Sequence, residues 1–183
     1  MLALVIIVVI VVLLIALVIG SYNAIVRLRN QVDNGWSQID VQIKRRADLI
    51  PNLVETVKGY AAHESGTFEA VVAARNASVQ ASTPAEAAAA EGPINAALGK
   101  LFALAEAYPD LKADANFRQL QSEITATEDR IAYARQFYND SVTRYHNRID
   151  TFPGAVVAKF GTFPHRELFE ADDIDRPVPK VQF

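Results

Sequence analysis

The three histidines of this 183-residue chain, one of them followed by a glutamate, are the first candidates for holding a metal ion or transferring a proton. His63 and Glu64 match the start of the zinc-site motif H-E-x-x-H, but position 67, where the second histidine is needed, is Thr. His146 and His165 have no carboxylate-rich partner at ligand spacing. We therefore predict solvated or capping histidines, with no metal and no cofactor.

Catalytic motifs are missing from the sequence. Glu128, Asp129 and Arg130 could act as an acid–base group only in a cleft that shifts their pKa values, and a slender helical protein favours surface i,i+4 pairing instead. The chain has no cysteine, no glycine-rich phosphate loop and no G-x-S-x-G motif, so thiol chemistry and disulfides are excluded. A net charge of −3 gives no indication of nucleic-acid binding. We predict a protein that is not an enzyme.

Residues 2–19 contain no charged or polar side chain. As a helix this stretch is about 27 Å long, close to the hydrocarbon thickness of a bilayer. The absence of a basic n-region and of an A-x-A site favours a retained anchor over a cleaved signal peptide. Basic side chains follow the stretch and none precedes it. The positive-inside rule then predicts a single-pass inner-membrane protein with its N-terminus outside and its C-terminal domain in the cytoplasm.

Side chains just after the anchor fit a membrane interface. Tyr22 lies where an interfacial aromatic is expected, and Arg27 and Arg29 are the expected headgroup contacts. The basic residues 44–46 would lie about 35 Å past the membrane edge on a straight helix, several times the Debye length of roughly 8 Å. We expect those residues to contact an acidic face of a neighbouring helix.

Apolar side chains recur at helical spacing from Ile25 to Ile50, with no turn signal separating them from the anchor. Pro51 predicts a kink, after which the helix resumes towards Tyr60. A second helix is predicted around residues 68–79.

The second half of the chain contains further helix signals. Thr83, Pro84 and Glu86 form a capping box at the start of an alanine-rich helix, which Gly92 and Pro93 would interrupt. The clearest helix has near-heptad, coiled-coil-like spacing over residues 117–152. A short apolar helix over 155–160 and an irregular tail over 161–183 follow.

The pair Asn139–Asp140 interrupts the seam of that long helix. It is either an exposed polar patch or a buried polar contact that fixes register between helices or subunits. The residues favour neither interpretation.

The chain resembles the LemA family over nearly its whole length. The matching segments are YNAIVRLRN at 22–30, WSQIDVQIKRRADLIPNLV at 36–54, YAAHE at 60–64, RIAYARQFYND at 130–140, and FP at 152–153 with AKF at 158–160. The resemblance implies a membrane anchor followed by an elongated antiparallel helical bundle, with no established enzymatic activity. It also implies relatives in the magnetosome membrane, and genes that often neighbour a membrane zinc metalloprotease.

The expected fold is all-α, with an N-terminal transmembrane helix that continues into an elongated antiparallel helical bundle. The expected parts are an anchor at 1–21, a bundle at 22–160 and an extended C-terminal tail at 161–183.

The leading functional hypothesis is a homo-oligomeric membrane scaffold whose partners are itself and the lipid bilayer. Its predicted packing residues are Trp36, Ile39, Ile43, Tyr138, Val142 and Tyr145, and the segment 176–183 could dock on a neighbouring copy. The alternative is a monomeric adaptor that regulates a membrane protease or an envelope-stress system.

Overall fold

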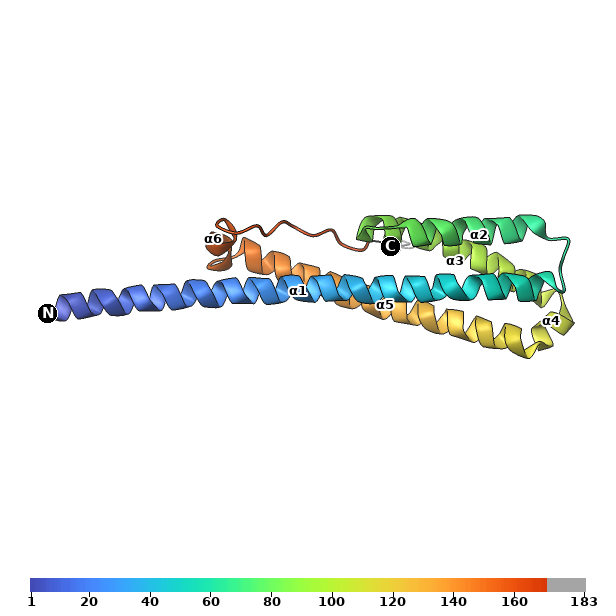
Figure 1. Cartoon of the computed structure of the whole chain (residues 1–183), viewed down its shortest axis with the longest axis horizontal. Helices are drawn as coiled ribbons and strands as arrows, with labels where there is room; N and C mark the ends of the chain where they lie inside the picture. Colours follow the sequence, from blue (N-terminus) through green and yellow to red (C-terminus); the bar gives the residue numbers. More distant parts are fainter. Residues whose placement is uncertain (171–183) are drawn as a thin grey trace, which may run out of the picture. The chain divides into compact units, whose positions relative to one another are not determined.

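The computed structural model describes residues 1–170, and these residues form six α-helices and no strand (Figure 1). The helices are α1 Leu2–Lys58, α2 Ser65–Gln80, α3 Pro84–Glu106, α4 Pro109–Ala113, α5 Ala115–Asp150 and α6 Gly154–Ala158. The all-α expectation is confirmed. The predicted docking segment 176–183 lies outside the described residues.

The chain divides into two compact units. The first unit comprises residues 1–37 and 135–168, and the second comprises 38–134 with, among the described residues, 169–170. Both α1 and α5 therefore contribute residues to each unit.

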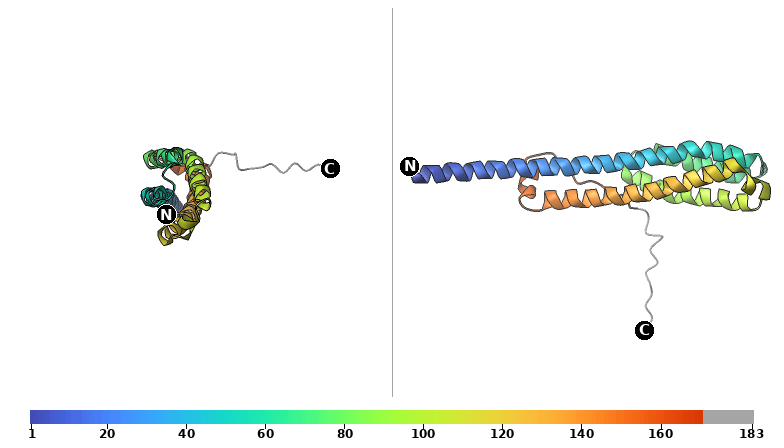
Figure 2. Two further views of the ribbon diagram at one scale, coloured as in Figure 1. Left: turned by 90° about the vertical axis from the view of Figure 1, so that its right-hand side faces the viewer. Right: turned by 90° about the horizontal axis from the view of Figure 1, so that it is seen from below.

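In the second unit, α1, α2, α3, α4 and α5 surround one apolar core. Figure 2 shows the helices end-on, lying side by side. The core residues are Ile50, Leu53, Val54, Val57, Ala61, Phe68, Val71, Ile94, Ala97, Leu98, Leu101, Ala105, Leu111, Phe117 and Ile124. Their three- and four-residue steps are the spacing that places apolar side chains on one helical face.

The helix α1 continues through Pro51 without a break. Proline lacks an N–H, so the carbonyl of Ala47, four residues earlier, has no partner within the helix. Arg75 of α2 supplies that partner, because its Nε donates a hydrogen bond to the Ala47 carbonyl oxygen at 3.1 Å. A contact from a second helix thus compensates for the hydrogen bond that proline removes.

Replacing Arg75 with alanine should destabilise the second unit by about 1–3 kcal/mol, the cost of leaving a buried acceptor unsatisfied. The variant Pro51→Ala restores the backbone donor, so the double variant should recover much of the loss. Urea unfolding of the wild-type protein, the two single variants and the double variant tests this prediction. Equal effects of Arg75→Ala in both backgrounds would contradict it.

The capping box at Thr83 and Glu86 is confirmed, because Thr83 Oγ1 accepts from the Glu86 N–H and the Glu86 carboxylate accepts from the Thr83 N–H. Hydrogen bonds from the Ser82 N–H and hydroxyl, and then from the Thr83 N–H, lower the pKa of the Glu86 carboxyl. The predicted interruption at Pro93 is wrong, since α3 runs through it. Buried side chains on both sides of Pro93 hold this helix against the core, which outweighs the local cost of proline.

In the first unit, α1 and α5 approach closely at a glycine. A β-carbon added at Gly35 would lie 3.1 Å from the Cα of Tyr138. The ring centroids of Trp36 and Tyr138 are 6.3 Å apart. A larger side chain at position 35 would separate the two backbones, so this glycine is required for packing rather than for a turn.

Candidate membrane-interface site

The anchor is exposed around its whole circumference. Residues 2–20 are exposed throughout, and their helix is the one in the described part of the chain that is long and apolar enough to cross a membrane. Burial begins at Ser21, whose Oγ accepts a hydrogen bond from Arg148 Nη2 at 3.4 Å. The N-terminal helix therefore fits a membrane anchor, with its packed part starting immediately after the apolar stretch.

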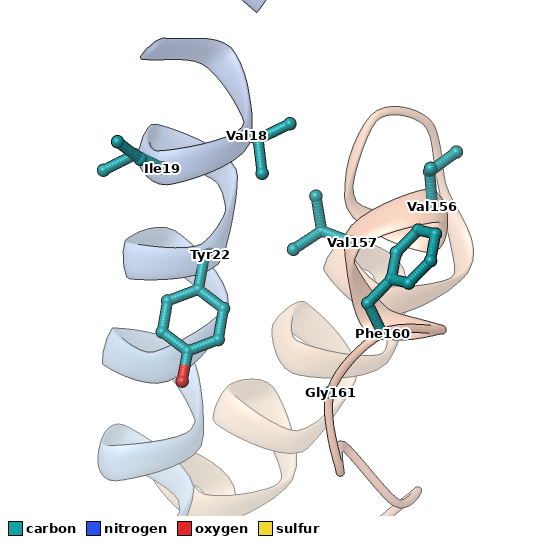
Figure 3. Close-up of a pocket in the computed structure, with 7 residues that line it drawn as sticks. All are labelled: Val18, Ile19, Tyr22, Val156, Val157, Phe160 and Gly161. Atoms are coloured by element: carbon teal, nitrogen blue, oxygen red, sulfur yellow. The ribbon is translucent and has the colours of Figure 1, made fainter. Parts of the chain in front are cut away.

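A second apolar surface lies beside the last turns of the anchor. The chain reverses after α5, and α6 lies next to α1, with Val157 pointing towards Val18 (Figure 3). Between them is a cavity of about 350 Å³, lined by Val18, Ile19, Tyr22, Val156, Val157, Phe160 and Gly161. The Tyr22 hydroxyl is the sole polar side-chain group in this lining, so the cavity suits an apolar occupant.

The turn before α6 depends on a glycine. A β-carbon at Gly154 would lie 1.9 Å from the carbonyl oxygen of Arg148, which is far inside van der Waals contact. The chain can therefore reverse tightly only with glycine at this position. On either side of α6, Phe152 and Phe160 are 80% and 90% exposed.

Aromatic and basic side chains surround this apolar surface. The ring of Phe163 meets the ring of Tyr22 edge-on at 5.7 Å between centroids, and the Arg29 guanidinium lies 5.9 Å from the Phe163 centroid. Arg27 and Lys159 are exposed. Of the predicted headgroup residues, Tyr22 and Arg29 are thus brought together by Phe163. Sequence reasoning missed Phe163, because no periodicity connects it to α1.

Residues 162–168 run along α5 and are held there by hydrogen bonds. The Tyr145 hydroxyl donates to the Pro164 carbonyl at 3.0 Å, and the Tyr138 hydroxyl donates to the Glu167 carbonyl at 2.7 Å. Burial raises the pKa of both phenols. Because the two hydroxyls are buried, these bonds satisfy groups that would otherwise lose their solvation.

Six residues are predicted to carry the packing of helical domains in an oligomer: Trp36, Ile39, Ile43, Tyr138, Val142 and Tyr145. All except Trp36 are buried inside the chain, and Trp36 is half-buried. The packing role is therefore internal to one chain, and a contact of these residues with a second copy stays a prediction. Of the Asn139–Asp140 pair, Asp140 is exposed and Asn139 is half-buried.

The structure brings two histidines together. The ring centroids of His146 and His165 are 4.6 Å apart, and His165 Nε2 lies 3.1 Å from an Asp150 carboxylate oxygen. A single carboxylate, distant in sequence, thus lies beside His165, which the spacing of the sequence did not indicate. No group of three metal-ligating side chains occurs among residues 1–170.

Acidification should loosen the segment at Arg166. The backbone N–H of Arg166 donates to His146 Nε2 at 3.0 Å, a bond that protonation of Nε2 removes. Burial, and then the neighbouring His165, lower the pKa of His146, although Asp150 opposes them. The folded state therefore binds this proton less readily than the unfolded state. The stabilisation that neutral His146 contributes is complete above about pH 6.5, and it is lost as the pH falls through the pKa of His146 in the folded state.

Hydrogen exchange measures this effect directly. The protection factor of the Arg166 amide should fall between about pH 7 and about pH 5. The variant His146→Gln keeps an acceptor that does not titrate, and its protection should be constant over that range. An equal fall in both proteins would show that His146 is not responsible.

The second unit contains a buried charge. The Arg46 side chain is 0% exposed, and its guanidinium pairs with the carboxylates of Glu91 in α3 and Glu128 in α5. Arg46 Nη1 also donates to Asn95 Oδ1 at 3.3 Å, and Asn95 Nδ2 donates to Glu128 at 3.1 Å. The expected contact of the basic residues 44–46 with acidic neighbouring helices is confirmed for Arg46. The expectation that Glu128 makes only surface i,i+4 pairs is wrong.

Comparison with known proteins supports the resemblance. The profile of the LemA family matches residues 35–183. Protein LemA of Metamycoplasma hominis is 30% identical over 162 residues, which cover 86% of this chain and 73% of that protein. Magnetosome protein MamQ of Magnetospirillum gryphiswaldense is 28% identical over 184 residues, which cover 86% of this chain and 68% of that protein. Neither name denotes a catalytic activity.

Proposed function

This chain belongs to the LemA family, and from that membership we propose that it is a non-enzymatic, membrane-anchored scaffold that self-assembles through its helical domain to organise or shape the membrane. The anchor supports the membrane location, because an apolar helix exposed on every side needs a lipid environment. The similarity to magnetosome proteins supports a role at a membrane.

Exposed aromatic side chains on α5 carry the self-assembly part of the proposal. In the second unit Tyr133 is 74% exposed, and in the first unit Phe137 is 45% exposed. Aromatic residues are enriched at protein–protein interfaces. The partner that would cover these two side chains is a second copy of this chain. Anchors in one membrane hold the copies in parallel at high effective concentration, so weak contacts suffice for assembly.

Imaging of the full-length protein in lipid, together with mass photometry after detergent extraction, tests this proposal. We expect a regular assembly larger than a monomer. The variants Tyr133→Ser and Phe137→Ser should shift the population towards monomers, whereas Gln136→Ser, at an exposed polar position of the same helix, should not. A monodisperse monomer in both measurements would refute self-assembly. A stable complex with a membrane protease in place of self-association would support the adaptor alternative.

The proposed orientation places the C-terminal domain in the cytoplasm and the anchor in the inner membrane. Arg27 and Arg29 lie just beyond the apolar stretch, where positive charge disfavours export. A reporter that fluoresces only in the cytoplasm, fused after Phe183, should be bright. A dark, full-length fusion would reverse the assigned orientation.

A further inference from the structure

We propose that α6 and its flanking residues form a second membrane contact, an apolar wedge that inserts into the leaflet at the C-terminal end of the anchor. The wedge consists of residues 152–160, and the occupant of the cavity between α6 and α1 is a phospholipid acyl chain of that leaflet. This inference rests on the membrane anchoring in the proposed function and is independent of self-assembly.

The depth of the wedge follows from its contact with the anchor. The cavity that Val157 and Phe160 line is closed on its other side by Val18 and Ile19. Those two residues end the uncharged stretch, and a helix over residues 2–19 reaches about 27 Å, against about 30 Å of hydrocarbon. If the anchor spans the bilayer, Val18 and Ile19 lie near the edge of the hydrocarbon, and α6 lies beside them at the same depth.

Apart from Lys159, the exposed side chains of the wedge are apolar. Phe152, Val156 and Phe160 are all exposed, and α6 itself, Gly-Ala-Val-Val-Ala, carries no charge. A cluster of this kind beside a membrane helix marks a membrane contact. Val157, by contrast, is buried towards α1. The wedge thus has one side packed on the protein and one side open to lipid.

Three backbone N–H groups of the wedge donate hydrogen bonds within the turn, which lowers the cost of placing them in lipid. The N–H of Ala155 donates to the Thr151 carbonyl at 2.8 Å, and the N–H of Val156 donates to the Pro153 carbonyl at 3.2 Å. At the other end, the N–H of Phe160 donates to the Val157 carbonyl at 3.1 Å. These three N–H groups would therefore enter an apolar medium with their hydrogen bonds made.

A basic and aromatic rim limits how deeply the wedge can enter. Lys159 is exposed next to Phe160, and its long side chain can reach the headgroups while its stem stays among apolar groups. Tyr22 lines the cavity, the Phe163 ring meets it edge-on, and Arg29 lies over the Phe163 ring. Aromatic and cationic groups prefer this level of the membrane. Because the cavity itself is apolar, its occupant is an acyl chain rather than a headgroup.

The anchor and the wedge together would constrain the orientation of the protein in the membrane more than the anchor alone. A single helix can tilt in the bilayer, whereas a wedge beside its axis fixes the tilt of the first unit and the side of it that approaches the membrane. In a scaffold, every copy would then stand at the same depth and tilt in the membrane. The wedge would thus orient the assembly as well as attach it.

Tryptophan quenching by brominated acyl chains tests the wedge. The chain has a single tryptophan, so Trp36→Phe provides a dark background for single tryptophans at Phe160, Val18 and Gln136. The full-length variants are reconstituted in phosphatidylcholine vesicles with or without brominated acyl chains. We expect Phe160→Trp to emit at short wavelength and to lose most of its emission to bromine, as Val18→Trp does. Gln136→Trp, an exposed site elsewhere on α5, should be little quenched.

The outcomes separate the two proposals. If Val18→Trp is quenched and Phe160→Trp is not, the wedge is refuted and the anchor stands. If neither is quenched, both the wedge and the membrane anchoring in the proposed function are refuted. Quenching of all three positions would show that the signal does not report on the wedge, and would refute the specific insertion of α6.

Discussion

Replacing Arg46 with alanine should destabilise the second unit by about 3–5 kcal/mol, the typical cost of removing one partner from a buried ion pair. The substitution leaves the buried Glu91 carboxylate without its guanidinium partner and removes a donor from Glu128. It also leaves a cavity where a fully buried side chain stood. Because Glu128 is partly exposed to water, most of the loss should come from Glu91.

The matched control for this prediction is the neighbouring residue. Arg45 is exposed, so Arg45→Ala removes the same charge from the same helix and should change the stability by no more than about 0.5 kcal/mol. Urea unfolding of the detergent-solubilised protein, followed by circular dichroism, measures both. Unfolding of Arg46→Ala and Arg45→Ala at the same urea concentration would contradict a stabilising buried ion network at Arg46.

Truncating Tyr138 to alanine should destabilise the first unit by about 3–5 kcal/mol, as for other buried aromatic side chains. The substitution removes the ring that packs on Trp36 and the hydroxyl that bonds the Glu167 carbonyl. The variant Tyr138→Phe removes only the hydroxyl and should cost about 1 kcal/mol. Hydrogen exchange of amides in residues 22–37 and 135–150 measures both effects.

The same pair of variants distinguishes packing inside the chain from packing between copies. If Tyr138 packs inside one chain, Tyr138→Ala should lower hydrogen-exchange protection even in a monomeric, detergent-solubilised sample. A variant that loses assembly but keeps wild-type protection as a monomer would instead place Tyr138 at a contact between copies.

The sequence predicted most of the helices, because their signals are local. The capping box at Thr83 and the long stripe of α5 each depend on residues a few positions apart. The error at Pro93 and the continuity through Pro51 have a common cause. Proline reduces local helix propensity, but the contacts that override it, such as Arg75 with the Ala47 carbonyl, come from another helix. The short helix α4 was also missed.

The site was harder to predict, because residues distant in sequence create it. Arg46 shows which signal was available: Ile39, Ile43, Arg46 and Ile50 follow steps of four, three and four, so an arginine occupies an apolar stripe. A charge at such a position indicates a buried partner. No comparable signal joins Val157 to Val18, since the reversal at Gly154 and the path of the chain after α5 bring them together.

The central claim is that residues 2–19 remain in the bilayer as part of the working protein. Intact-mass spectrometry of the native protein, combined with alkaline carbonate extraction of membranes, tests it most directly. We predict that the protein stays in the extracted membrane pellet with a mass that includes the apolar segment. Recovery of a chain that begins near Ser21 in the soluble fraction would contradict the account.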